Sequence, residues 1–131
     1  MFVDASAIVG ILAREVDGPD LAARVTQADR LFTSPLAIYE AVLGLARSRN
    51  MAIDDAQTAV SNFLTGSRAE IVSITEEVGR DAIRAFDRFG RGRHPARLNM
   101  GDCFAYACAR SLAVPLLFKG DDFSQTDIAV A

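Results

Sequence analysis

Short apolar segments alternate with longer helical stretches along the whole chain, and this alternation is the feature that most limits its fold. We expect strands at residues 2–4, 30–33, 70–74 and 114–119, with a last edge strand at 126–128. Helices are expected at residues 7–14, 21–28, 35–49, 54–64, 75–89 and 101–112. Strands that alternate with helices pair in parallel through right-handed crossovers, which cover both faces of the sheet. The pattern therefore predicts an α/β fold: one domain over residues 1–131, a three-layer α/β/α sandwich whose mainly parallel central sheet has four to five strands.

Local signals place the ends of several helices. Ser6 is the expected N-cap of the first helix, and Gly18-Pro19 is expected to interrupt the helical pattern. Ser34 followed by Pro35 is typical of an N-cap with proline at the first helical position.

Charge and cysteine content narrow the class of protein. The net charge of −3 means that the overall field does not attract nucleic acid, so any such binding needs a local basic patch. Cys103 and Cys108 lie about 140° apart around the predicted helix, which argues against a disulfide between them. No segment approaches the roughly 18 apolar residues of a membrane span. We expect a reduced, cytoplasmic protein with no membrane association.

Acidic residues fall where strands end. Asp4 closes the first strand, and Asp121 and Asp122 follow the strand at residues 114–119. The carboxyl ends of parallel strands meet at one edge of a sheet, so these carboxylates converge if the two strands are neighbours. Taken alone, Asp4 could equally be a capping residue, and the Gly-Asp-Asp sequence could be an ordinary turn.

Two further acids lie on helices. Glu40 shares a helix face with Leu36 and Leu43, where a charge is costly unless it is compensated. Asp102 begins the helix at residues 101–112 and is expected to point inward. The simpler alternatives are a partly exposed or arginine-paired Glu40, and an Asp102 placed at a helix N-terminus by the helix dipole.

Converging carboxylates need cations. Two like charges about 4 Å apart cost about 4 kcal/mol at an effective dielectric near 20. Oxygen ligands without a histidine or cysteine cluster favour a hard divalent ion, Mg²⁺ or Mn²⁺. The chain contains neither of the glycine-rich nucleotide-binding motifs, G-x-G-x-x-G after the first strand and G-x-x-x-x-G-K-[ST]. His94 is its only histidine, which argues against a histidine-rich zinc site. An aspartyl-phosphate phosphatase would need an Asp-x-Asp motif at the end of the first strand. Here Ser6 stands where the second aspartate of that motif would be.

Four stretches together resemble the PIN domain, in its VapC toxin branch: residues 3–7 (VDASA), Glu40, residues 98–103 (LNMGDC) and residues 117–128 (LFKGDDFSQTDI). The resemblance implies a metal-dependent endoribonuclease that a VapB antitoxin inhibits, in homodimers and toxin–antitoxin hetero-oligomers. The residues that it assigns to the catalytic metal site are Asp4, Glu40, Asp102 and Asp122, with Asp121 as the second choice for the fourth acid. It also assigns site-ordering roles to Ser6 and Thr126, with Asp127 beside the latter.

A basic loop precedes Asp102 in this otherwise acidic chain. The candidate RNA-phosphate contacts are Arg91, Arg93, His94 and Arg97, with Arg88 before them and Lys119 next to the fourth acid. The alternatives to RNA contact are a solvated loop and a contact with an acidic partner. The first helix carries more apolar residues than one face needs, which we interpret mainly as core and otherwise as a partner surface. The functional alternatives are a PIN-like RNA- or protein-binding module with little catalysis and a small Mg²⁺-dependent phosphatase.

Overall fold

The computed structural model describes all residues from 1 to 131. A parallel four-stranded sheet with strand order β3-β2-β1-β4 lies at its centre. The strands are β1 (Phe2–Val3), β2 (Phe32–Thr33), β3 (Glu70–Ile71) and β4 (Leu116–Leu117). The helices are α1 (Ala5–Leu12), α2 (Gly18–Gln27), α3 (Pro35–Arg49), α4 (Ile53–Gly66), α5 (Glu76–Phe89) and α6 (Met100–Ser111), followed by the short 3₁₀ helix η1 (Phe123–Gln125).

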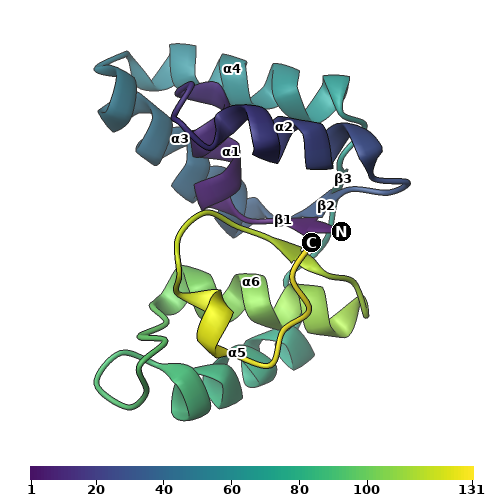
Figure 1. The fold of residues 1–131 in the computed structure, drawn as a ribbon, viewed down its shortest axis with the longest axis vertical. Coiled ribbons are helices and arrows are strands. Elements are labelled where there is room, and N and C mark those ends of the chain that lie inside the picture. The colour runs from purple at the N-terminus through teal and green to yellow at the C-terminus, as the bar shows by residue number, and fades with distance from the viewer.

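Helices cover both faces of the sheet, as Figure 1 shows, with α1 to α4 on one side and α5 and α6 on the other. Successive strand residues point to opposite faces, so Phe2 and Leu116 join the core beneath α5 and α6, whereas Val3 and Leu117 join the core beneath α1 to α4. This confirms the predicted three-layer α/β/α sandwich. No helix is long and apolar enough to cross a membrane.

The first helix begins earlier than the sequence suggested. Its N-cap is Asp4, not Ser6, because the Asp4 carboxylate accepts the backbone N–H of Ser6 at 2.9 Å. Gly18-Pro19 likewise begins α2 instead of interrupting a helix, since proline in the first turn lacks only an N–H that would have no helical partner there. The predicted start of α3, with Ser34 as N-cap and Pro35 after it, is confirmed.

The strands are shorter than predicted, and the last one is absent. Residues 126–128 do not form an edge strand; η1 precedes them, and a single bridge pairs Val130 with Leu116. The hydroxyl of Thr126 explains the local turn, because it donates to the carbonyl of Phe123 at 2.8 Å and accepts from the N–H of Ile128. Both cysteines are free and buried.

The apolar residues of α1 belong to the core. Ile8 is fully buried, and Val9, Ile11 and Leu12 pack against the same core cluster. An exposed apolar groove lies between α5 and α6, where Ile83 and Met100 are 71% and 64% exposed.

Candidate active site

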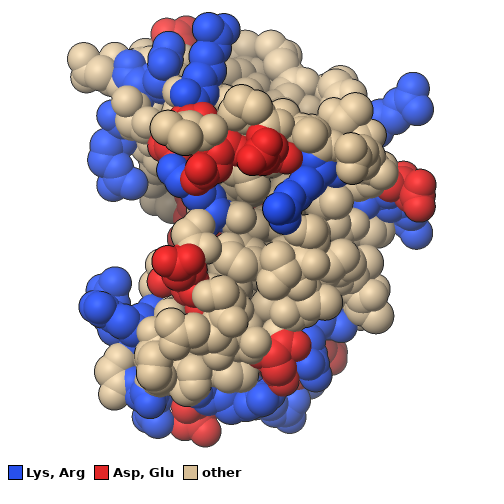
Figure 2. Space-filling model, viewed as in Figure 1, with Lys and Arg blue, Asp and Glu red and all other residues tan.

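A cavity of about 430 Å³ opens at the carboxyl edge of the sheet, beside the neighbouring strands β1 and β4. Asp4, Glu40 and Asp102 all line it, although they are separated by 36 and 62 residues in the sequence. Figure 2 shows acidic groups above and below an indentation at the left of the molecule, with basic groups nearby. The fold therefore brings together three of the predicted acids.

Asp4 is the most buried of these acids, with 5% of its surface exposed. Burial raises the pKa of its carboxyl, the two hydrogen bonds from Ser6 oppose that effect, and the charge of Asp122 adds to it. The hydroxyl of Ser6 donates to Oδ2 of Asp4 at 2.5 Å and accepts the backbone N–H of Lys119 at 3.0 Å. Ser6 thus holds the Asp4 carboxylate and ties the end of β1 to the end of β4.

Glu40 reaches the cavity from α3 and rests against the first turn of α6. A Cβ atom built on Gly101 would lie only 2.2 and 2.3 Å from the two carboxylate oxygens of Glu40. Burial, then the charges of Asp4 and Asp102, raise the pKa of Glu40 to about 7. Its neighbours Leu36 and Leu43 are not core residues, since Leu36 is partly buried and Leu43 is 38% exposed, so the expected burial of Glu40 among core leucines is wrong.

Asp102 lines the cavity and also caps α6. It forms a capping box with Asn99, in which its carboxylate accepts the Asn99 N–H at 2.8 Å and the Asn99 side chain accepts the Asp102 N–H at 2.9 Å. Burial raises the pKa of Asp102 to about 6; the Asn99 N–H and the charge of Arg91 oppose this shift, while Asp4 and Asp122 add to it. The helix-start alternative and the site assignment are therefore compatible.

The two aspartates after β4 differ in their surroundings. The charge of Asp122 raises the pKa of both Asp4 and Asp102. Asp121 instead forms a turn, in which its carbonyl accepts the backbone N–H and the hydroxyl of Ser124. Asp122 remains the predicted fourth acid.

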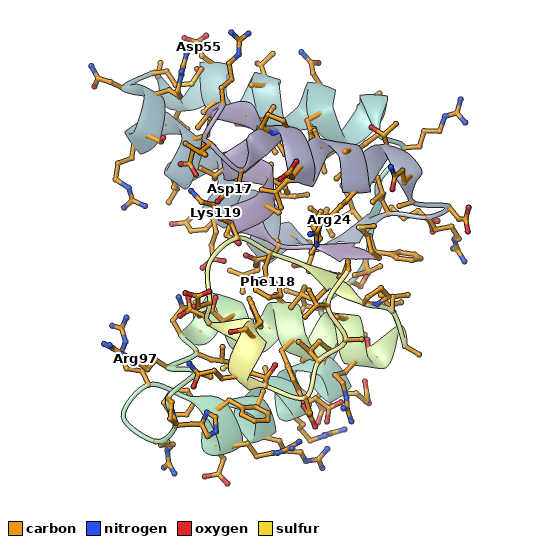
Figure 3. The ribbon with its side chains drawn as sticks, viewed as in Figure 1. Asp17, Arg24, Asp55, Arg97, Phe118 and Lys119 are labelled. Carbon is orange, nitrogen blue, oxygen red and sulfur yellow. The ribbon has the colours of Figure 1, made fainter.

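Lys119 is the only lysine of the chain, and it lines the cavity. Its ammonium group donates to Glu15, which lines the same cavity, and this hydrogen bond is the main reason that its pKa is raised. Figure 3 places Lys119 at the left of the molecule, on the side of the sheet nearer α1, and Arg97 on the same side below it.

The residues of the basic loop differ in their availability. Arg91 and Arg97 make no ion pair. The charge of Arg91 acts to lower the pKa of Asp102. Arg93, in contrast, donates to Asp87 at 2.9 Å and lies 5.8 Å from the ring centre of Phe86. His94 packs edge-on against Phe89 and accepts the Ala96 N–H, so its role in the structure is to shape the loop.

The C-terminal pair lies outside the cavity. The Thr126 hydroxyl donates to the carbonyl of Phe123 within the local turn. Asp127 accepts from the Tyr106 hydroxyl at 2.5 Å and from Arg88 at 3.0 Å. Arg88 is thereby engaged away from the cavity.

Four polar residues that line the cavity were not predicted from the sequence as site residues: Glu15, Arg47, Ser48 and Asn99. The N-cap position of Asn99 could have revealed it, because asparagine three residues before an acid is a capping signal. Arg47 could have been found from helical spacing, since Gly44 and Arg47 follow Glu40 at i+4 and i+7. Glu15 gave no such signal.

Comparison with known proteins decides the family. The family model described as "PIN domain" matches residues 1–129. A VapC ribonuclease of Rhizobium meliloti is 42% identical, with 97% of this chain and 98% of the relative covered. Ribonuclease VapC30 of Mycobacterium tuberculosis is 35% identical over 98% of this chain and 96% of its own length. The chain belongs to the PIN-domain family, in its VapC branch. The predicted resemblance is confirmed.

Solved structures agree with this PIN fold. The crystal structure of Mycobacterium tuberculosis VapC20, described as a Sarcin-Ricin loop cleaving toxin, aligns with a TM-score of 0.78 at 16% identity, over 99% of this chain and 97% of that one. A chain of a toxin–antitoxin complex from Klebsiella pneumoniae aligns with a TM-score of 0.70 at 13% identity, over 99% and 95%. Both support the fold of this PIN domain.

The residues of this PIN domain suit a hard divalent ion in their chemistry. All candidate ligands are carboxylates, and the charges of neighbouring acids add to burial in raising the pKa values of Glu40 and Asp102, a repulsion that a cation would relieve. As they stand, no three Asp, Glu, His or Cys side chains are grouped closely enough to hold one ion.

Metal-free protein is expected to lose stability as the pH rises from about 4 to 7. Glu40 has a pKa of about 7 in the fold against 4.5 ordinarily, and Asp102 about 6 against 3.8. A raised carboxyl pKa means that the folded state binds the proton more tightly, so its contribution is full below the ordinary pKa and is lost as the pH passes the folded value. Solvent screening limits the size of the effect for these half-buried groups.

Thermal unfolding in EDTA at pH 5.0 and 7.5 measures this effect. The wild-type midpoint is expected to fall between the two pH values by more than that of Glu40→Gln, and Mg²⁺ is expected to raise it at pH 7.5. Equal pH dependence in the two proteins would contradict the assignment to Glu40.

Proposed function

We propose that this PIN domain is a divalent-metal-dependent endoribonuclease, the toxin of a toxin–antitoxin module. The observation that carries the proposal is the meeting of Asp4, Glu40 and Asp102 in one cavity of a chain whose relatives are VapC ribonucleases. The reaction would be hydrolysis of RNA phosphodiester bonds.

Asp4, Glu40, Asp102 and Asp122 are the residues that would hold one or two Mg²⁺ or Mn²⁺ ions. Such an ion lowers the pKa of a bound water and stabilises charge on phosphoryl oxygens. Ser6 would fix the Asp4 carboxylate, and the Asn99 capping box would fix Asp102. Lys119 and Arg91 would contact substrate phosphates.

The side chains do not favour a covalent mechanism. His94, the only histidine, is engaged with Phe89 and the Ala96 N–H. Both cysteines are buried, and burial raises their pKa values to about 11, so neither is a thiolate at neutral pH. Water as the nucleophile agrees with these environments.

The direct test is cleavage of RNA by purified protein in Mg²⁺, with EDTA as the control. Sequencing RNA 5′ ends after expression without antitoxin would identify the target at the same time. Binding without cleavage would favour a non-catalytic RNA-binding module, and hydrolysis of small phosphomonoesters would favour a phosphatase.

The proposed partners follow from the family. A VapB-type antitoxin would inhibit the enzyme in a toxin–antitoxin hetero-oligomer, and the toxin itself would be a homodimer in the cytoplasm. The toxin–antitoxin complex among the structural neighbours supports the antitoxin partner.

Within the basic loop, Arg91→Ala is expected to weaken RNA binding several-fold more than Arg93→Ala. Arg91 is free of ion pairs and acts on Asp102 electrostatically, whereas Arg93 is held by Asp87 and Phe86. Loss of one phosphate contact on single-stranded RNA should also reduce the salt-dependence slope by about 0.7. Fluorescence anisotropy at several salt concentrations measures both quantities, and equal effects of the two variants would contradict this assignment.

A further inference from the structure

The site cavity extends beyond its acids along α3. Glu40, Gly44, Arg47 and Ser48 all line it, and their spacing of four and seven or eight residues places them on one face of the helix. Gly44 leaves the wall between Glu40 and Arg47 without a side chain. A Cβ there would lie 3.0 Å from Cγ2 of Val9, so α1 and α3 approach closely beneath this part of the wall.

Arg47 is an unpaired cation in a cavity that four carboxylates line. Lys119 is hydrogen-bonded to Glu15, but Arg47 makes no ion pair and no side-chain hydrogen bond, although Asp4, Glu15, Glu40 and Asp102 share the cavity with it. The adjacent arginine of the same helix turn is different, because Arg49 donates to the carbonyl of Ala13. The guanidinium of Arg47 is therefore free to bind an anion.

The spacing of Arg47 and Glu40 along α3 indicates which kind of anion Arg47 would bind. Seven helical residues separate Glu40 and Arg47, a rise of about 10 Å. Arg47 is therefore anchored about two helical turns from Glu40 in the same cavity, a spacing that suits a phosphate next to the scissile one. Guanidinium groups bind phosphates through two parallel hydrogen bonds, and a hydroxyl such as that of Ser48 can add a third.

We propose that Arg47, with Ser48, forms a subsite for a backbone phosphate of the RNA that flanks the scissile phosphate. This rests on the proposed ribonuclease function and adds a second contact region to it, opposite the loop that carries Arg91. The RNA strand would cross the acidic centre between the two, from the start of α6 to the last turns of α3.

RNA binding by the non-cleaving Asp4→Asn protein tests the subsite. The probe is a 12-nucleotide single-stranded RNA of mixed sequence, measured with and without Arg47→Ala. We expect Arg47→Ala to weaken binding about five- to tenfold and to reduce the salt-dependence slope by about 0.7. Arg68→Ala is the matched control, since Arg68 also makes no ion pair but lines a separate pocket between α2 and α4. It should change neither quantity.

Neutral methylphosphonate linkages locate the contact. Replacing one phosphate at a time should weaken binding to the Arg47 protein at one flanking position, and that penalty should disappear in Arg47→Ala while the others remain. Arg47→Lys should restore part of the affinity, because it keeps the charge but not the planar fork.

The outcomes separate the subsite from the proposed function. If the wild-type protein cuts RNA but Arg47→Ala matches Arg68→Ala in affinity and slope, the subsite is wrong and the ribonuclease remains. The same conclusion follows if Arg47→Ala weakens only the antitoxin complex. A wild-type protein that neither binds nor cuts RNA would overturn the proposed function and the subsite with it.

Discussion

Asp4→Asn is expected to abolish RNA cleavage while leaving the fold intact. Asparagine can still accept the Ser6 N–H, which Asp4 accepts at 2.9 Å, and asparagine is as good an N-cap as aspartate. The substitution also removes a charge from a residue that is 5% exposed, so the free energy of unfolding should hold or rise. The loss of activity should exceed about 100-fold, because even the outer partners of metal ligands contribute 10–100-fold.

Single-turnover cleavage in Mg²⁺ and thermal unfolding measure the two halves of this prediction. Asp55→Asn is the matched control: Asp55 is an exposed acid in the first turn of α4, far from the cavity in Figure 3, and it should retain wild-type cleavage. Full activity of Asp4→Asn would show that Asp4 is not a ligand. Lost activity with an unfolded protein would show instead that the carboxylate itself is needed for folding.

The arrangement of the fold followed from the sequence because its determinants are local. Alternating strands and helices imply parallel pairing, and the handedness of crossovers leaves few topologies. The ends of β1 and β4 therefore meet, as the hydrogen bond between Ser6 and the Lys119 N–H shows. The strand lengths were overestimated, because apolar residues beside a strand pack into the core without pairing, as Val114 and Phe118 do.

The composition of the site was less predictable than its location. Acids at strand ends and helix starts are visible in a sequence, but the partners of a charged residue are not. In the sequence, nothing distinguishes Arg88 and Arg93 from Arg91 as candidate RNA contacts. In the structure, however, Arg93 donates to Asp87 and Arg88 donates to Asp127. Arg47 and Glu15 line the same cavity because α1 and α3 pack together, a tertiary relation that no short motif records.

Gly101 is a site residue that carries no functional group. It occupies the second position of α6, where the Glu40 carboxyl carbon and both oxygens lie within 2.5 Å of the place that a Cβ would take. The conformation there is ordinary helix, so backbone freedom is not the reason for glycine. Glycine is required because any side chain would occupy the space of the Glu40 carboxylate.

Gly101→Ala should therefore lower cleavage by about 100-fold or more while the fold remains at least as stable. The contact is with the end of a flexible side chain, so Glu40 can rotate away at small cost, and alanine gains about 1 kcal/mol over glycine in helix propensity. A displacement of about 1 Å in a reacting assembly costs on the order of 100-fold in rate. Cleavage rates and thermal unfolding of the same preparation measure both effects, and Gly79→Ala in α5, where a Cβ meets nothing within 4 Å, is the control.

A double-mutant cycle separates displacement of Glu40 from other effects of the new methyl group. Glu40→Ala removes the carboxylate, so Gly101→Ala should cost nothing further in that background, and the two losses should be strongly non-additive. Additive losses would mean that the methyl group acts through another part of the cavity, for example through the capping box of Asn99 and Asp102 in the same turn. Non-additive losses would place Glu40 among the groups whose position limits the reaction, because the three atoms nearest to the new methyl group all belong to its carboxylate.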